Sequence, residues 1–156
     1  MSNDFTHLHL HSQYSFLDGA IRIKDLIKKI SELQMSQVAV TDHGNMFGAL
    51  DFYKQAKQAG IKPILGIEAY VTSSADYTEK VRENFHLILL AQNNIGYANL
   101  KKLTSESFLR GKYFFPRIDK KLLYKHREGL IATTACLGGE VGKKLAQNDR
   151  DGARKA

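Results

Sequence analysis

Short apolar runs rich in β-branched residues alternate along the chain with longer segments whose apolar positions recur at helical spacing. Five of the short runs are predicted to be strands, at residues 6–10, 37–41, 62–71, 86–91 and 129–133. Strands that alternate with helices are typical of a parallel sheet joined by crossover helices. The pattern therefore predicts an α/β fold.

Helical spacing is clearest between the first two strands, where one face of the predicted helix is apolar and the other is charged. The apolar positions are Ile23, Leu26, Ile27, Ile30 and Leu33. A second helix is predicted over 46–59, with Gly60 in the left-handed position that follows many helices. Further helices are predicted at 95–108, 119–125 and 139–147, and residues 149–156 look like the beginning of another.

Five strands are too few to close a barrel, which usually needs about eight. The last segment, 149–156, also has no C-cap and no apolar stripe long enough to bury. We therefore expect the chain to be the front part of a larger fold.

With 156 residues, the chain has the size of one domain, and its apolar content is sufficient for a core. No apolar run is long enough to span a membrane, and residues 1–5 carry neither the basic nor the apolar stretch of a secretory signal. The single cysteine, Cys136, excludes an internal disulfide. These features predict a soluble, cytoplasmic protein.

The net charge of +7 comes from one segment, 101–127, which holds nine basic residues against Glu106 and Asp119. Within it, basic residues alternate with aromatic ones over 108–117, a mixture that suits phosphates and stacked bases, or an acidic partner. A solvated loop whose aromatic rings pack on the domain is an equally good interpretation. The candidate contact residues are Arg110, Lys112, Tyr113 and Arg117.

Histidines provide the candidate chemistry. On a strand, His9 and His11 project to the same side with Cα atoms about 7 Å apart, close enough to share an ion, while Leu8 and Leu10 point the other way. Residues able to bind metal also follow or interrupt the later predicted strands: Asp18, His43, Glu68, His86 and Cys136.

Metal-binding residues of parallel α/β folds collect at the carboxyl ends of strands, so these side chains are expected to converge. Glu68 is a lone acid in an apolar run and needs a partner or an ion. His86 fits least well, because it is predicted to open its strand rather than to end it. Seven ligands exceed the capacity of one tetrahedral zinc, so two or more divalent ions, zinc, manganese or iron, are expected. Such clusters favour phosphoester hydrolysis.

Simpler interpretations stay open for several of these residues. The His9 and His11 pair could be an exposed strand face, and Asp42 and His43 could form a turn and helix cap, for which Asn45 is better still. Of the remaining two histidines, His7 is expected to be structural and His126 solvated. The single cysteine could be a small buried apolar residue.

Three segments, 7–19, 41–48 and 60–68, closely resemble the polymerase and histidinol phosphatase (PHP) domain at the N-terminus of the bacterial DNA polymerase III alpha family. The polymerase branch, rather than the free-standing phosphatases, is indicated by three more segments: 110–113, 116–119 and 135–140.

The resemblance implies a distorted seven-stranded (β/α) barrel with parallel strands, crossover helices and two or three divalent ions. By this resemblance the metal ligands are His9, His11, Asp18, His43, Glu68, His86 and Cys136. The last family motif, Asp-x-His, has no counterpart in the chain, so residues 1–156 are expected to form a PHP domain truncated before that motif.

The implied activity is metal-dependent 3′ to 5′ exonuclease proofreading at a DNA primer terminus, in a polymerase that replicates DNA. No catalytic residue is expected beyond the ligands that activate water. The implied partners are the DNA primer, the remainder of the alpha subunit and other replicase subunits. A non-catalytic scaffold and a small-molecule phosphatase of the histidinol-phosphate type are the alternatives.

Overall fold

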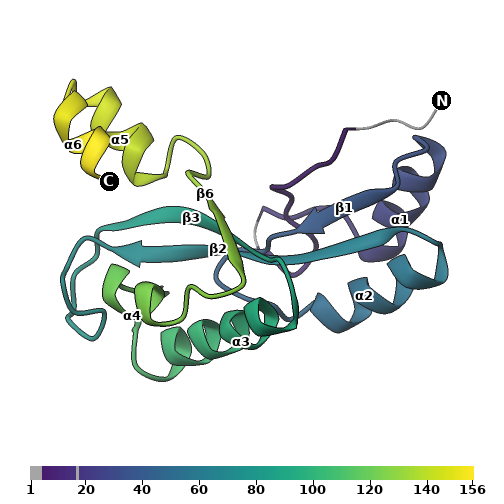
Figure 1. Cartoon of the computed structure of the whole chain (residues 1–156), viewed down its shortest axis with the longest axis horizontal. Coiled ribbons are helices and arrows are strands. Elements are labelled where there is room, and N and C mark those ends of the chain that lie inside the picture. Colours follow the sequence, from purple (N-terminus) through teal and green to yellow (C-terminus); the bar gives the residue numbers. More distant parts are fainter. Residues whose placement is uncertain (1–4, 17) are drawn as a thin grey trace.

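The computed structural model describes residues 5–16 and 18–156, which form a mixed α/β fold (Figure 1). In chain order the elements are α1 (Ile23–Glu32), β1 (Gln37–Val40), α2 (Ala49–Gln58), β2 (Lys62–Thr72), β3 (Asn84–Ala91), α3 (Asn94–Leu109), β4 (Lys112–Tyr113), β5 (Phe115–Ile118), α4 (Lys120–Lys125), β6 (Leu130–Thr133), α5 (Glu140–Ala146) and α6 (Arg150–Lys155). None of the helices in these described ranges is long and apolar enough to cross a membrane.

One long strand, β2, organises the sheet. Its first part, Lys62 to Leu65, pairs in parallel with β1, and Tyr70 and Val71 pair in parallel with β5. Along Gly66 to Thr72 the strand also pairs with β3, which runs antiparallel, and β6 is antiparallel to β3. The strand order is β4-β5-β2-β3-β6, with β1 also on β2.

The parallel sheet with crossover helices is therefore confirmed for β1, α2 and β2 and corrected for β3 and β6. A parallel crossover needs a connection of about a dozen residues or more, usually containing a helix. Residues 73–83 join β2 to β3 with no helix, so the chain folds back antiparallel.

The predicted first strand, residues 6–10, is not a strand in the structure. The segment runs beside β1, where the backbone NH groups of Ala39 and Thr41 donate to the carbonyl oxygens of His7 and Leu10 at 2.9 and 2.8 Å. The NH of Leu10 donates to the Thr41 hydroxyl, at 2.9 Å, rather than to a carbonyl. That side-chain contact replaces a bond that a regular ladder would need, and the segment stays irregular.

The helices follow the prediction with shifted boundaries. The apolar face of α1 is buried, although Leu33 lies just beyond its end and is exposed. Helix α2 begins at Ala49 instead of residue 46, because the preceding residues form a turn in which the Asn45 side chain accepts from the NH of Phe47 at 3.0 Å. Asn45 is therefore not the cap that the sequence suggested. Gly60 has the expected positive φ, 74°.

The described residues form three apolar clusters along β2, and the two larger ones are its cores. The first packs α1, β1 and α2 together, around Val38 and Phe52. The second lies between β2, β3 and α3, around Leu89, Leu100 and Leu103. Burying one such side chain contributes about 1.5–3 kcal/mol, so the two cores fix β2 at both ends. Helices α5 and α6 have no buried residues and form the outlying yellow part of Figure 1.

Candidate metal centre

Glu68 lies in β2 with no exposed surface, and four imidazole rings contact its carboxylate. Its Oε2 is 2.6 Å from His9 Nε2 and 3.5 Å from His11 Nε2. Its Oε1 is 2.7 Å from His43 Nδ1 and 3.0 Å from His86 Nδ1. The lone acid of the apolar run thus has four partners from three other parts of the chain.

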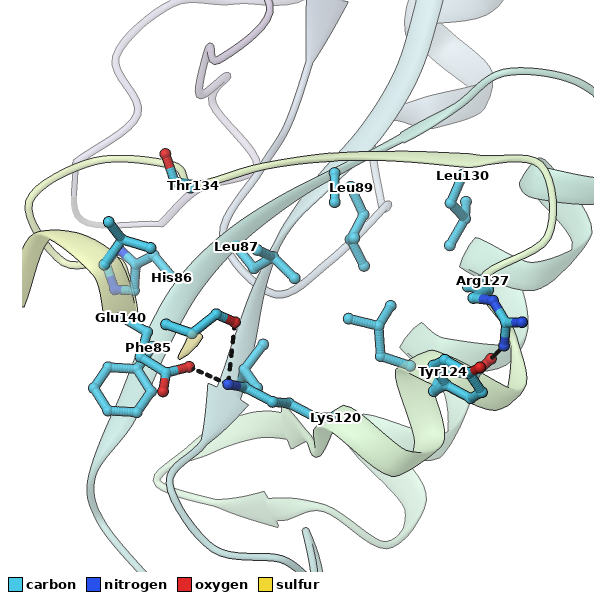
Figure 2. Close-up of a pocket in the computed structure, with 15 residues that line it drawn as sticks. Phe85, His86, Leu87, Leu89, Lys120, Tyr124, Arg127, Leu130, Thr134 and Glu140 are labelled. Carbon is cyan, nitrogen blue, oxygen red and sulfur yellow. Dashed lines mark hydrogen bonds and ion pairs between the residues drawn. The ribbon is translucent and has the colours of Figure 1, made fainter. Parts of the chain in front are cut away.

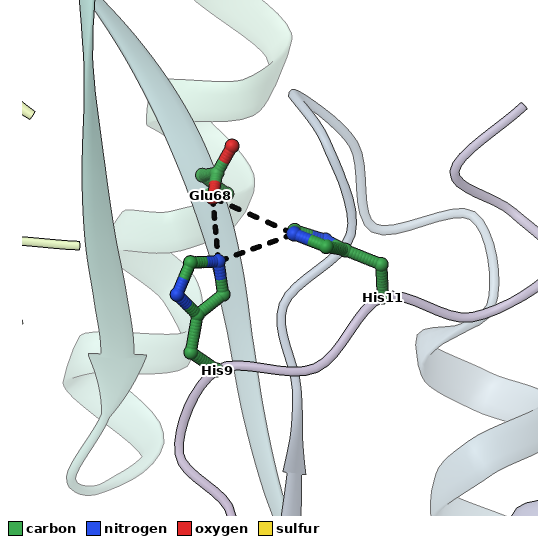
Figure 3. A group of neighbouring side chains, drawn as sticks. All are labelled: His9, His11 and Glu68. Atoms are coloured by element: carbon green, nitrogen blue, oxygen red, sulfur yellow. Dashed lines mark hydrogen bonds and ion pairs between the residues drawn. The ribbon is translucent and has the colours of Figure 1, made fainter. Parts of the chain in front are cut away.

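His9 and His11 point toward the same place, as the alternation predicted, although their segment is not a regular strand. Their Nε2 atoms are 3.1 Å apart and both face Glu68 (Figure 3). The ligand-type atoms of these three side chains all lie within 4.8 Å of one another. Three donor atoms this close together could hold one small cation.

His86 reaches the same carboxylate because β3 is antiparallel. In the register of the sheet His86 is opposite Tyr70, two residues beyond Glu68, so both side chains lie on one face. The beginning of an antiparallel strand is at the same edge as the end of its neighbour, which removes the misfit seen in the sequence. Cys136 follows β6 and places Sγ 3.5 Å from His86 Nδ1. Glu68, His86 and Cys136 form a second group of three close ligand atoms.

His43 follows β1 and links the centre to the loop before α1. Its Nε2 is 2.8 Å from Asp18 Oδ2, while its Nδ1 faces Glu68. The next residue, Gly44, has a φ of 61°, and a Cβ there would lie 2.7 Å from Pro116 Cγ. Glycine therefore permits the tight approach of this turn to β5. Each of the other six predicted ligands is thus linked to Glu68, either directly or through one other member.

Asp42 has a structural role that the sequence did not reveal. Its buried carboxylate accepts hydrogen bonds from the Ser12 NH at 2.6 Å, the Ser12 hydroxyl at 2.8 Å and the Ser15 hydroxyl at 2.7 Å. The Ser15 hydroxyl in turn accepts from the His43 NH at 3.0 Å. Asp42 is therefore not a cap of α2. It fixes the loop of residues 12–16 against the end of β1.

The electrostatics of the centre favour an ionised carboxylate. Burial alone would raise the pKa of Glu68, but the contacts with His43 and His86 outweigh it and hold that pKa far below its ordinary value. The Glu68 contact raises the pKa of His43, and Asp18 adds to this effect. Burial, with the neighbouring His43, lowers the pKa of His11 and favours its neutral form. A neutral imidazole is the form that binds metals.

Three buried atoms at the centre test whether these residues suit metal ions. Glu68 Oε1, His43 Nδ1 and His11 Nδ1 have no hydrogen-bond partner among the described residues, even though Oε1 and the His43 nitrogen are only 2.7 Å apart. An unsatisfied buried polar atom costs about 1–3 kcal/mol. Coordination to a cation would satisfy Glu68 Oε1 and His43 Nδ1, whose lone pairs converge without hydrogen-bond geometry. Imidazole, carboxylate and thiol donors suit zinc, manganese or iron, so the donor set fits.

The candidate contact residues of the basic segment behave differently from one another. Arg117 is 1% exposed, so its assignment to a surface contact is wrong. Its guanidinium donates to the carbonyl oxygens of Gly111 at 3.0 Å and Glu79 at 2.8 Å, and also to those of Tyr77 and Val81. The alternation of basic and aromatic residues in the sequence does not indicate which basic side chain will be buried and hydrogen-bonded to backbone carbonyl groups.

The other candidates stay accessible. Arg110 is exposed and forms an ion pair with Glu106 on α3, Lys112 is exposed, and Tyr113 is half-buried. His7 contacts Phe5 edge to face, and His126 is the C-cap of α4.

A separate apolar pocket of about 400 Å³ lies between β3, β6, α4 and α5 (Figure 2). Leu87, Leu123 and Leu130 line it, and at its rim Lys120 Nζ is 2.7 Å from Glu140 Oε2. Apart from His86 it is lined by no candidate ligand, so the candidate ligands gather at Glu68 and not in this pocket.

Comparison with known proteins gives consistent matches. The sequence profile of the PHP domain family matches residues 7–156. DNA polymerase III subunit alpha of Borreliella burgdorferi is 53% identical over 154 residues, covering 96% of this chain and 13% of that subunit. The subunit of Helicobacter pylori strain J99 is 56% identical over 146 residues, covering 93% of this chain and 12% of its own length. The chain thus spans 12–13% of these relatives.

Among solved structures, an amidohydrolase from Chromobacterium violaceum with bound sulfate and no metal is similar. It shares 25% sequence identity at a TM-score of 0.47, over 65% of this chain and 34% of that chain.

Proposed function

The chain belongs to the PHP domain family, and from that membership we propose that it is a metal-dependent phosphoesterase that hydrolyses the terminal phosphodiester of a DNA strand. The observation that carries the proposal is the convergence of four imidazoles on one buried carboxylate, Glu68. Structural ion pairs rarely need so many ring nitrogens around one acid, whereas multinuclear metal sites do.

Two or three divalent ions, zinc, manganese or iron, are the proposed cofactors. His9, His11 and Glu68 would hold one, and Glu68, His86 and Cys136 would hold a second, with the carboxylate shared. His43 and Asp18 would complete the set. When bound, ions of this kind supply Lewis acidity toward phosphate oxygens and lower the pKa of water.

The protein's own contribution is positioning. Asp42 holds the loop that leads to Asp18, and the two cores hold Glu68 at a fixed point between the segments that bring the histidines. A fixed constellation lowers the cost of ordering ligands and substrate at the moment of reaction. No residue outside the ligand set is assigned to proton transfer.

The relatives support a role in DNA replication. The two DNA polymerase III alpha subunits are 53% and 56% identical to the chain over nearly its whole length. We therefore propose a primer terminus as substrate, 3′ to 5′ removal of nucleotides as the reaction, and the remainder of an alpha subunit with other replicase subunits as partners. The proposed compartment is the cytoplasm.

Metal content and cleavage test this proposal together. Elemental analysis should find two or three equivalents of zinc, manganese or iron, and a mismatched primer should lose 3′ nucleotides only with metal present. His9→Ala and His43→Ala should abolish release, whereas His126→Ala, which changes a histidine outside the centre, should not. Cleavage that survives both ligand substitutions would overturn the assignment.

A non-catalytic scaffold is the second candidate, favoured by the position of Glu68 between the two cores. In that case metal would raise the melting temperature substantially with no phosphoester cleaved, because ligands that bind only the folded state stabilise it. Turnover of small phosphomonoesters, unaffected by charge reversal at Arg110 and Lys112, would instead indicate a small-molecule phosphatase.

A further inference from the structure

An aromatic path leads from the metal centre to the surface. The Tyr70 ring stacks against His43 at 6.2 Å and lies edge-on to His86 at 5.4 Å. The Tyr70 ring also contacts the ring of Phe115 of β5, with the centroids 4.8 Å apart. Tyr70 is 8% exposed and Phe115 44% exposed, so the path opens to solvent at Phe115.

The neighbouring residue, Phe114, is held outward at the turn between β4 and β5. It is 60% exposed and has a φ of 60°, a conformation that bulky residues rarely adopt. Such a conformation costs about 1–3 kcal/mol and persists only where the surrounding structure enforces it. The Arg82 guanidinium lies 4.2 Å above the Phe114 ring. An exposed ring is thus presented under a cation.

The segment that precedes Arg82 is fixed to this hairpin. The buried guanidinium of Arg117 on β5 donates to the carbonyl oxygens of Glu79 and Val81, immediately before Arg82. Lys112 on β4 is a second exposed cation, and within the described parts of the chain no carboxylate pairs with either Arg82 or Lys112. The two charges are therefore available to phosphates.

We propose that Phe114 and Phe115 form a base-stacking subsite for single-stranded DNA, with Arg82 and Lys112 binding its phosphates and the strand end at the Glu68 centre. This subsite rests on the proposed function, and it would bind the part of the strand that precedes the cleaved bond. Aromatic platforms beside cations are the usual device for single strands, because unpaired bases offer their faces and paired bases do not. A protein partner has no equal need for two exposed rings beside a phosphodiesterase centre.

Binding without cleavage tests the subsite. The affinity of the chain for fluorescein-labelled oligothymidylate is measured by anisotropy in EDTA, beside an abasic oligonucleotide of equal length. The double variant Phe114→Asn with Phe115→Leu should bind oligothymidylate about tenfold more weakly, as expected for losing stacking worth about 1–3 kcal/mol per base. Asparagine tolerates the positive φ, and leucine keeps an apolar contact with Tyr70. The preference over the abasic strand should also disappear.

Tyr124→Leu is the matched control, because Tyr124 lies on a different element, α4, and is also an exposed ring beside a cation. It is 66% exposed, and the Arg127 guanidinium lies 3.6 Å from the centre of its ring. It should leave both affinities unchanged. Unchanged affinity in the double variant, with circular dichroism like the parent's, would overturn the subsite and point to a protein partner for the hairpin. If the double variant binds more weakly but the parent chain shows no metal-dependent cleavage, the subsite would be supported and the proposed hydrolysis would be wrong.

Discussion

The two sides of Glu68 are built differently. On one side, His9, His11 and His43 come from segments tied together by the buried carboxylate of Asp42 and packed on the first core. On the other side, Cys136 lies in an exposed loop that leads to helices with no buried residues. From this difference we expect that one half of the centre is formed by folding itself, whereas the other half would need a bound ion to become ordered.

Removal of the Asp42 carboxylate should have the largest effect. In Asp42→Ala three donors, the Ser12 NH and two serine hydroxyls, lose their common acceptor inside the protein. Because each unsatisfied buried group costs about 1–3 kcal/mol, the free energy of unfolding should fall by about 3 kcal/mol or more. Urea denaturation measures this fall. A loss below about 1 kcal/mol would contradict the conclusion that Asp42 holds the segments of His9, His11 and His43 together.

Gly44→Ala should have the next largest effect, on the same side. The new Cβ would lie 2.7 Å from Pro116 and 2.9 Å from the Tyr70 ring, at a φ of 61°. Left-handed backbone and a clash with buried groups cost about 1–3 kcal/mol, so unfolding should be easier by roughly that amount in the absence of metal. Gly60→Ala is the control, because Gly60 also has a positive φ but nothing lies within 4 Å of its Cβ position. Equal losses in both variants would show that packing at Gly44 is unimportant.

Gly138→Ala should act on the second side and affect metal more than stability. Its Cβ would lie 2.9 Å from His86 Nδ1, a ring that can turn aside. The free energy of unfolding without metal should change by less than about 1 kcal/mol, because the half-exposed ring can move away from the new Cβ. Metal content should nevertheless fall by one equivalent, as measured by elemental analysis. An unchanged metal content would indicate that His86 binds no ion.

Cys136→Ser should have the smallest effect on the apo protein, within about 0.5 kcal/mol, because the thiol is exposed. The difference should appear only after metal is added, as a smaller rise in melting temperature than the parent shows. Ser12→Ala, on the first side, is the counterpart that should destabilise the apo protein. A large apo effect at Cys136 would remove the contrast between the two sides.

The sequence predicted which side chains would gather but not all of the means by which they do. Period-two alternation placed His9 and His11 on one side correctly, even though the segment is irregular, because the direction of side chains survives a poor ladder. The antiparallel β3 was not predictable from its own residues, since strand direction depends on the length and content of the connection, and this made His86 look misplaced.

Two further failures have one cause. Asp42 and Arg117 each make several buried hydrogen bonds to residues distant in sequence, and no local pattern marks such partners. The β4–β5 hairpin was also missed, because its strands are two and four residues long and aromatic and basic residues dominate them.

The shared strand β2 has a consequence for how the molecule is assembled. Side chains alternate along it, so a slip of one residue against β3 would turn Glu68 away and present Ile67 or Ala69 to the histidines. A misaligned sheet would have no carboxylate among the histidines and could not bind the proposed metal ions. Metal binding would therefore distinguish molecules in which β2 and β3 pair in the correct register from molecules in which they do not.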